Sequence, residues 1–509
     1  MATATHAGKK AGSGTRAPDY ARRRPESTLL YRLVEKHYPA FEARLAAEGR
    51  SLPRYVAREF EDFLACGRLE HGFLRLACDG CRAERLVAFS CKRRGFCPSC
   101  GARRMAESAT HLVDEVFPER PVRQWVLSVP HPLRFLFAND PEIMGAALGI
   151  VHRCLAAHLI AKAGLSRRGA HTGAVTLIQR FGGALNLNVH FHMLLLDGVH
   201  VERPDGTLRF RRVGAPTAAE LEALTRTLAR RIGRLLERRG LLERDAENAW
   251  LAGDEDAEPA AIDTLRAASI TYRVAIGPHR GRKAFTVRTL PPAHDGPAED
   301  EARSRASGFS LHAGISAGAT ERRKLERLCR YISRPALSEK RLSLTANGPV
   351  RYRSKTPWRD GTTEVVLDPL DFLARLAALV PRPRVNLTRF HGVFAPNSPL
   401  RARITSARRG LGATEGSSAD RDEATTLPTP LASSRWARRL KRVFGIDIAS
   451  CLACGGRLRI LACIEDRRTV DAILAHLARK AAEPERLASP HRVPPGRAPP
   501  TTTPAPRFS

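Results

Sequence analysis

The sequence contains no run of eighteen apolar residues, so we expect no membrane-spanning helix. Its first residues are rich in Gly, Ala, Lys and Arg and include no apolar h-region, which argues against a secretory signal peptide. Acidic residues are scarce, because 52 Asp and Glu stand against 84 Lys and Arg, for a net charge of +32. This imbalance favours a polyanionic partner, above all a nucleic acid.

Length and composition indicate a multidomain protein of the cytoplasm. A chain of 509 residues with 43% hydrophobic residues can form several cores. Its eleven cysteines are odd in number and include closely spaced pairs, which is typical of metal binding in a reducing compartment. We therefore expect a cytoplasmic protein.

Composition and periodicity divide the chain into six parts, in which ordered segments alternate with segments of low complexity. We expect a disordered basic arm (1–25), a helical and zinc-binding domain (26–117), a larger domain of mixed strands and helices (118–404), a linker (405–434), a small basic segment with one CxxC pair (435–480) and a disordered tail (481–509).

Two cysteine pairs near the start of the chain have the spacing of a zinc site. Cys78 and Cys81 form one CxxC pair, and Cys97 and Cys100 form a second after fifteen residues. Such pairs bind zinc as a closed thiolate tetrahedron, which stabilises a small module and leaves no open position for catalysis. The sequence therefore predicts one structural Zn²⁺ on these four thiolates. Basic residues, including Arg93 and Arg94, lie between the pairs and favour contact with phosphate.

Two histidines share one face of a predicted strand. The segment 184–196 alternates in polarity and contains His190 and His192, whose side chains point the same way because strand side chains repeat every two residues. Two imidazoles on a polar face backed by an apolar one favour a divalent metal ion. A third ligand is needed, for which we prefer His312 on an alternating segment, with Gln179 and His131 as alternatives.

A single tyrosine lies beside the buried stripe of a predicted helix. We expect this helix from Glu321 to Ser333, capped by Thr320. Helical spacing puts Tyr331 next to the apolar stripe, with Arg327 one turn and Lys324 two turns earlier on the same side. A phenol flanked by cations can meet a phosphodiester, and the positive charge favours its phenolate form.

These elements, in this order, resemble the rolling-circle HUH transposases of bacterial insertion sequences that carry an N-terminal zinc-binding domain. The resemblance extends over about 60–404 and rests on FSCKRRGFCPSCGARRMAESATHLVDEVFP (89–118), WVLSVPHPLRFLFAND (125–140), GGALNLNVHFHMLLLDGV (182–199), RLCRYISRPALSEKRL (327–342) and FHGVFAPNSPLRARI (390–404).

The resemblance implies an α+β protein in which an HUH endonuclease domain, an antiparallel sheet with packed helices, follows the zinc module. It implies that Tyr331 attacks a phosphorus of single-stranded DNA at insertion-sequence ends or targets and stays joined to the 5′ end. It also implies that His190 and His192 hold catalytic Mg²⁺ or Mn²⁺, while Lys324, Arg327, Arg93 and Arg94 contact phosphate.

The chain departs from many relatives in having one tyrosine on this helix. Arg327 stands four residues before Tyr331 and Pro335 four residues after it, as in the single-tyrosine branch. Near the C-terminus, a second zinc site on Cys451, Cys454 and Cys463 is an open alternative. Only one CxxC pair is present there, and His476 would have to supply the fourth ligand. Alternative interpretations are an HUH replication initiator or relaxase, and, in another class, a non-catalytic zinc-dependent DNA-binding protein or zinc-ribbon factor.

Overall fold

The computed structural model describes residues 24–245, 249–252, 259–290, 302–358, 360–406 and 449–482. The predicted basic arm, linker and tail fall outside these ranges apart from a few residues at their ends. Helices and strands are mixed throughout, so the α+β class predicted from the sequence is confirmed.

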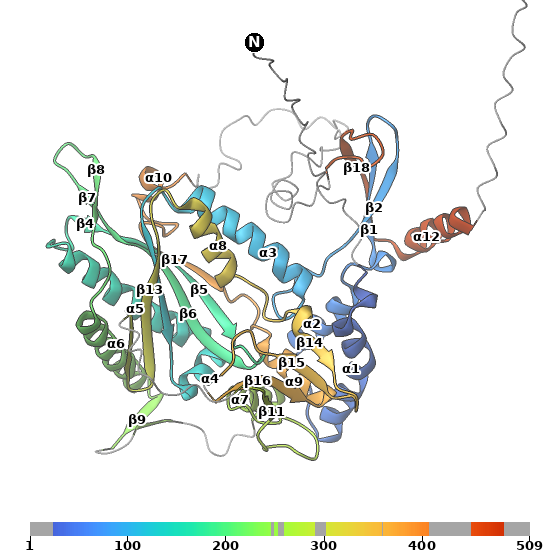
Figure 1. Cartoon of the computed structure of the whole chain (residues 1–509), viewed down its shortest axis with the longest axis horizontal. Coiled ribbons are helices and arrows are strands. Elements are labelled where there is room, and N and C mark those ends of the chain that lie inside the picture. Colours follow the sequence, from blue (N-terminus) through green and yellow to red (C-terminus); the bar gives the residue numbers. More distant parts are fainter. Residues whose placement is uncertain are drawn as a thin grey trace, which may run out of the picture.

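A six-stranded antiparallel sheet forms the centre of the molecule (Figure 1). Its strands, in spatial order, are β12 (Arg303–Ala306), β13 (Phe309–Ala317), β3 (Val122–Ser128), β6 (Leu187–Leu196), β5 (Gly173–Phe181) and β17 (Thr388–Gly392). Alternating polarity lets each strand direct one set of side chains to each face. The predicted strand over 184–196 is confirmed, although it begins at Leu187 after a loop.

Helices cover both faces of this sheet. Phe191 on β6 packs against Phe137 of α4, with ring centroids 5.9 Å apart, and marks the larger core. The opposite face carries α3 and α8, whose apolar residues pack with Leu177 and Leu194. The helices are α3 (Pro98–His111), followed by the π-helical turn Leu112–Val116, then α4 (His131–Asn139), α5 (Pro141–Lys162), α6 (Ala218–Arg238), α7 (Ala261–Ile270), α8 (Arg322–Ile332), α9 (Pro369–Leu379) and α10 (Arg401–Ile404).

Local signals explain where the long helices begin. The Asp140 carboxylate accepts hydrogen bonds from the backbone N–H groups of Glu142 and Ile143, and Pro141 occupies the first turn of α5. Thr217 and Glu220 form a reciprocal capping box at the start of α6. Of the described helices, α5 is the one long and apolar enough to cross a bilayer, but half of that stretch is buried inside the fold, as in a core helix.

Smaller sheets surround the central one. They are β4 (Ala170–His171), β7 (Gly198–Glu202) and β8 (Leu208–Arg212); β11 (Phe285–Arg288), β16 (Thr362–Leu367), β15 (Val350–Arg353) and β14 (Leu342–Leu344); and the pair β9 (Leu242–Arg244) and β10 (Ala249–Leu251).

The N-terminal region is built from both ends of the chain. Two helices precede a hairpin, and the third strand of the hairpin sheet is β18, which pairs antiparallel to β1 (Figure 1). The C-terminal segment predicted over 435–480 thus completes the N-terminal sheet. The elements are α1 (Leu29–Ala47), α2 (Arg54–Ala65), β1 (Phe73–Cys78), β2 (Glu84–Ala88), β18 (Leu458–Ile464) and α12 (Arg467–Ala482).

Candidate active site and metal centres

The histidine pair lies on β6, between β3 and β5 in the middle of the sheet. As the two-residue period requires, His190 and His192 point to the same face, and their Nε2 atoms are 3.2 Å apart. With metal–nitrogen bonds of about 2.1 Å, this separation corresponds to an angle of about 100° at one shared ion. The pair therefore has the geometry of two neighbouring ligands.

Hydrogen bonds to Nδ1 orient both rings. The Nδ1–H of His190 donates to the carbonyl oxygen of Asn188 at 2.9 Å. The Nδ1 of His192 lies 2.7 Å from the side-chain nitrogen of Gln124. In this orientation the side-chain oxygen of Gln124 is buried without a hydrogen-bond partner. Rotating this amide lets the oxygen accept from Nδ1–H and leaves Nε2 as the free lone pair. Both rings then present Nε2 as a ligand, supported by an outer hydrogen bond.

Burial keeps the pair neutral. Desolvation lowers the pKa of His190 to about 4 and that of His192 to about 3. The positive charge of Arg334 contributes to lowering the pKa of both groups. Neutral imidazoles are the form that binds a metal ion.

The structure does not bring the preferred third ligand, His312, to this pair. His312 on β13 is in register with Val126 on β3, which is in register with His192, so one strand separates the two histidines. Two strand spacings amount to about 9.6 Å. Within the described ranges, no group of three His, Cys, Asp or Glu ligand atoms within 4.8 Å of one another includes the pair.

The alternative candidate Gln179 lies closer. It stands directly opposite His190 on β5 and is 4% exposed. Its Nε2 donates to the carbonyl oxygen of Ile332 at 2.9 Å, which ties β5, the strand next to the histidine strand, to the end of α8. The other alternative, His131, begins α4.

Helix α8 presents Tyr331 at the surface of the sheet. The predicted apolar stripe is buried as expected and consists of Leu325, Leu328, Cys329 and Ile332. The Tyr331 side chain is 42% exposed. The predicted cap is wrong, because Glu321 is the N-cap residue and no side chain caps the helix.

The cations over the tyrosine ring come from outside the helix. The Arg334 guanidinium carbon is 4.3 Å and the Lys355 ammonium 4.4 Å from the ring centroid. Lys324 instead pairs with Glu321 at 3.2 Å, and Arg327 is exposed. Lys355, which follows β15, was missed because only tertiary structure brings it to α8. The charge of Arg334 acts on Tyr331 and on both histidines, so it links the two halves of the candidate active site.

The cysteines form two clusters, so the predicted single site is wrong. The first cluster contains Cys66, Cys91, Cys97 and Cys100, and the second contains Cys78, Cys81, Cys451 and Cys454. Sulfur separations of 3.4–3.8 Å in the first and 3.5 Å in the second match the value of about 3.8 Å expected for a tetrahedral ion with Zn–S bonds of about 2.3 Å. Both donor sets fit structural Zn²⁺.

The hairpin β1–β2 explains why the two CxxC pairs separate. Cys78 ends β1 at the tip of the hairpin, whereas Cys97 precedes α3 beyond its base. Six residues of strand extend about 20 Å, which no single ion can bridge. The register of β18, which places Leu458 opposite Cys78, brings the C-terminal CxxC pair to the tip. Cys463 contacts Glu465. Neither Cys463 nor His476 belongs to one of the two clusters.

Comparison with protein families agrees with this architecture. Residues 173–402, which include the histidine strand and α8, match the family described as "Putative transposase". Residues 33–129 match the IS91-type "Transposase zinc-binding domain", which contains every ligand of the first cysteine cluster and the first CxxC pair of the second. No curated protein and no solved structure matches the chain.

Proposed function

We propose that this chain, which combines a transposase domain with a transposase zinc-binding domain, nicks and rejoins single-stranded DNA at insertion-sequence ends through a covalent 5′-phosphotyrosine. The observation that carries the proposal is the exposed Tyr331 beside Arg334 and Lys355, tied through Gln179 to a neutral histidine pair. On this proposal Tyr331 supplies the nucleophile, Arg334 and Lys355 supply cations for a phosphate, and the histidine pair supplies metal ligands.

The reaction is a transesterification at phosphorus. The Tyr331 hydroxyl loses its proton and attacks, so a bond forms between its oxygen and phosphorus while the bond to the 3′ oxygen breaks. The leaving 3′ oxygen takes up a proton and becomes a free 3′-OH. The phosphotyrosine conserves the energy of the phosphodiester, which lets a 3′-OH reverse the step and join a strand.

The other residues hold and neutralise the phosphate. Arg334 and Lys355 lie over the ring, where their charges offset the negative charge of the attacked group. His190 and His192, with the Gln179 oxygen as the third ligand that geometry favours, would hold Mg²⁺ or Mn²⁺. Such an ion, when bound, polarises the non-bridging phosphate oxygens.

A single tyrosine limits how the strands are exchanged. Arg327 lies on α8 four residues before Tyr331, and Pro335 lies in the loop after α8, four residues beyond Tyr331. Hand-over between two tyrosines on this helix is therefore unavailable, and we assign the chain to the single-tyrosine HUH branch. A free 3′-OH resolves the intermediate, or Tyr331 is used again.

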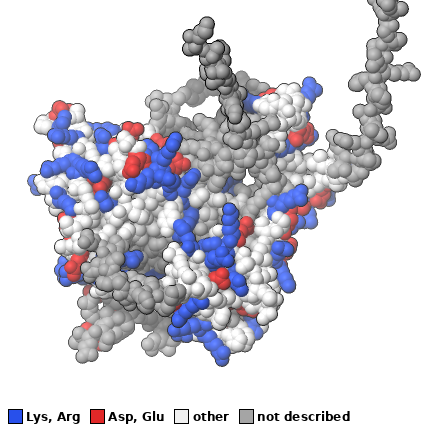
Figure 2. Space-filling model, viewed as in Figure 1, with Lys and Arg blue, Asp and Glu red and all other residues white. Residues whose placement is uncertain are grey.

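Charge supports DNA as the partner. The net charge is +32, and Figure 2 shows more Lys and Arg than Asp and Glu side chains on the visible face. The resemblance to HUH transposases favours single strands over duplex as the substrate. Binding should weaken steeply with salt as Lys and Arg contacts release counterions.

Denaturing electrophoresis of labelled oligonucleotides tests the proposal. With Mg²⁺ or Mn²⁺ present, a 3′-labelled strand carrying an insertion-sequence end should migrate with the protein, and a 5′-labelled strand should yield a shorter product with a free 3′-OH. A non-catalytic DNA-binding protein would release neither product. A replication initiator or relaxase would form the same adduct but at a plasmid origin, whereas a transposase joins the element end to a second strand.

A further inference from the structure

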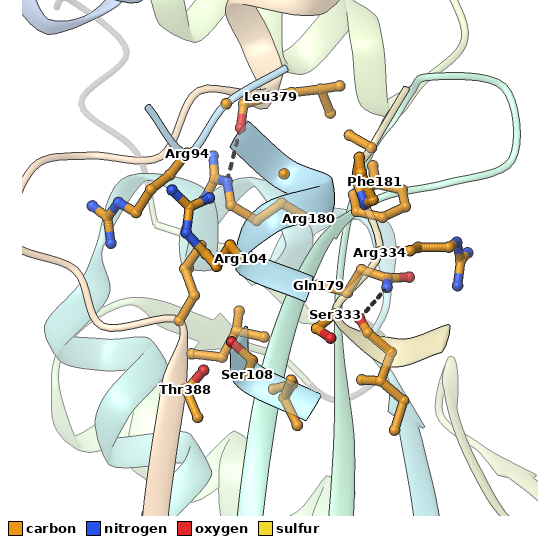
Figure 3. A pocket seen from close by; sticks show the side chains of 18 of the residues that line it. Arg94, Arg104, Ser108, Gln179, Arg180, Phe181, Ser333, Arg334, Leu379 and Thr388 are labelled. Carbon is orange, nitrogen blue, oxygen red and sulfur yellow. Dashed lines mark hydrogen bonds between the residues drawn. The ribbon is translucent and has the colours of Figure 1, made fainter. Parts of the chain in front are cut away.

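A small pocket lies between the zinc-binding region and the central sheet (Figure 3). It has a volume of about 120 Å³, and its walls include Arg94, Arg104 on α3, Arg180 on β5 and Arg334 after α8. Strand β17 begins at Thr388, opposite Leu177, so it leaves the edge of β5 from Gln179 to Phe181 open toward this pocket.

The pocket contains a buried arginine that lacks a full set of partners. Arg180 is 7% exposed, its Nε donates to the Leu379 carbonyl oxygen at 3.4 Å, and one terminal nitrogen has no hydrogen-bond partner. The positive charges of Arg266 and Arg94 act on this buried guanidinium as well. A buried guanidinium without an acidic partner is costly unless an anion completes the site.

Neighbouring arginines add positive charge at the pocket. Arg94 and Arg104 lie on the same side of the pocket as Arg180 (Figure 3) and donate to backbone carbonyls, at 3.2 Å to Arg382 and 3.0 Å to Lys92. The carboxylate whose charge acts on Arg94 is Glu59, which accepts from the Gly95 N–H at 2.6 Å. Glu59 thus acts on both Arg94 and Arg104, although its carboxylate is already bonded to backbone.

The pocket is continuous with the candidate active site. Gln179 and Ile332, whose hydrogen bond joins β5 to α8, both line it. Arg334 also lines it, but in Figure 3 its guanidinium points away from the other arginines, and it lies over Tyr331. Phe181 stands at the same rim, 5.3 Å from the Arg334 guanidinium carbon, and offers an aromatic face to a base.

We propose that this pocket binds one phosphodiester of the single-stranded substrate next to the scissile phosphate, with Arg180 and Arg104 as its main donors. The assignment rests on the proposed function, since it places a DNA strand across Tyr331. It gives the strand a fixed register, because one phosphate held between the zinc-binding region and β5 determines which neighbouring phosphate reaches the tyrosine. The planar fork of donors on an arginine side chain can bind two oxygens of one phosphate, so arginine recognises this group well.

Binding measurements on the full chain test this site. Fluorescence anisotropy with a single-stranded oligonucleotide, without added Mg²⁺ or Mn²⁺, should show about tenfold weaker binding by Arg180→Met, because one charge-assisted contact is lost. The slope of log affinity against log salt should fall by about 0.7. The matched control is Arg226→Gln on α6, an exposed arginine paired with Glu222, which should bind as the unaltered protein does.

A scan with single neutral methylphosphonates identifies the phosphate itself. One position should cost the unaltered protein affinity and cost the Arg180→Met protein nothing. Equal effects in both proteins at every position, or normal binding by a folded Arg180→Met protein, would overturn the proposal. If Arg180→Met fails to fold by thermal melting, Arg104→Gln at the rim serves for the same comparison with the same outcomes.

Two further measurements separate the explanations. If dTMP binds the unaltered protein more tightly than the oligonucleotide, and Arg180→Met loses that binding, then the pocket takes a free nucleotide and the DNA assignment is wrong. Adduct formation by the unaltered protein is scored separately. An adduct without a sensitive methylphosphonate position removes only the pocket assignment, whereas a sensitive position without an adduct removes only the proposed cleavage reaction.

Discussion

Gln179 donates a hydrogen bond to the carbonyl oxygen of Ile332 at 2.9 Å, and this contact joins the strand next to the histidine pair to the helix that carries Tyr331. The carbonyl belongs to the last turn of α8, where helices lack internal partners. Because Gln179 is buried and directly opposite His190, the position of the tyrosine is linked to that of the histidines through a single side chain.

Replacing Tyr331 by Phe should abolish the covalent adduct. The change removes one oxygen and keeps the ring against Arg334 and Lys355, so folding and DNA affinity should stay near normal. Adduct formation is measured on denaturing gels, followed by peptide mapping. Tyr352→Phe is the matched control: its ring is fully buried and its hydroxyl accepts a hydrogen bond from the Ser338 N–H, so it should retain the adduct. An adduct formed by Tyr331→Phe would identify a different nucleophile.

The sequence predicts the elements of this site better than their partners. Period-two and helical patterns placed His190, His192 and Tyr331 on the right elements, because local backbone geometry decides these positions. The ligands of the two cysteine clusters were assigned wrongly, since Cys66 and Cys91 stand outside any CxxC pair and Cys451 reaches Cys81 only through the pairing of β18 with β1. Lys355 is likewise brought to Tyr331 by tertiary structure alone. Long-range contacts carry no signal in a single sequence.

Loss of either histidine should stop cleavage while leaving DNA binding largely intact. In the proposed mechanism, Arg and Lys contacts provide affinity, whereas His190 and His192 would hold the ion that acts on the reacting phosphate. The measurements are adduct yield and anisotropy for His190→Ala and His192→Ala. Activity retained by either variant in the presence of metal would remove the pair from the active site.

Gln124 allows a more graded test of the same site. Its amide contacts Nδ1 of His192 at 2.7 Å, and outer hydrogen bonds of this kind change metal affinity about 10–100-fold. Gln124→Leu should therefore shift the Mn²⁺ concentration for half-maximal cleavage upward, with the maximal rate recovered at high Mn²⁺. An unchanged metal titration would show that Gln124 does not orient the ligand.

Purified protein should contain two zinc ions per chain. Cys97→Ser removes a ligand of the first cluster and Cys454→Ser one of the second, so each should retain one ion. Cys463→Ser is the control and should retain both, because this residue lies in neither cluster. Metal content is measured by mass spectrometry alongside thermal melting. Two independent sites would be contradicted if the unaltered protein contained a single zinc ion and both Cys97→Ser and Cys454→Ser contained none.

Removing residues 449–509 should cost one zinc ion and loosen the hairpin, since Cys451, Cys454 and β18 all leave with that segment. The expected change is a lower melting temperature without loss of the Cys66 cluster. Retention of both ions by the shortened chain would show that other residues complete the second site.

Acid should destabilise the fold partly through two stacked histidines far from the zinc clusters in sequence. His152 on α5 and His391 on β17 have ring centroids 4.8 Å apart, and both Nε2 atoms are buried without a partner. Burial lowers the pKa of each to about 4, and for His152 the nearby His391 adds to the effect.

The sign of the effect follows from proton uptake. Above about pH 6.5 both rings are neutral in the folded and unfolded states, so they do not affect stability. Between about pH 6.5 and 4 the unfolded chain binds protons that the folded protein does not, and stability falls by up to about 1.4 kcal/mol per pH unit for each histidine. His391→Phe keeps the stacked ring and removes one titrating group. Denaturant unfolding at pH 7 and pH 5 should therefore show this variant losing about 1–2 kcal/mol less stability than the unaltered protein, and an equal loss in both would show that His391 does not titrate in this range.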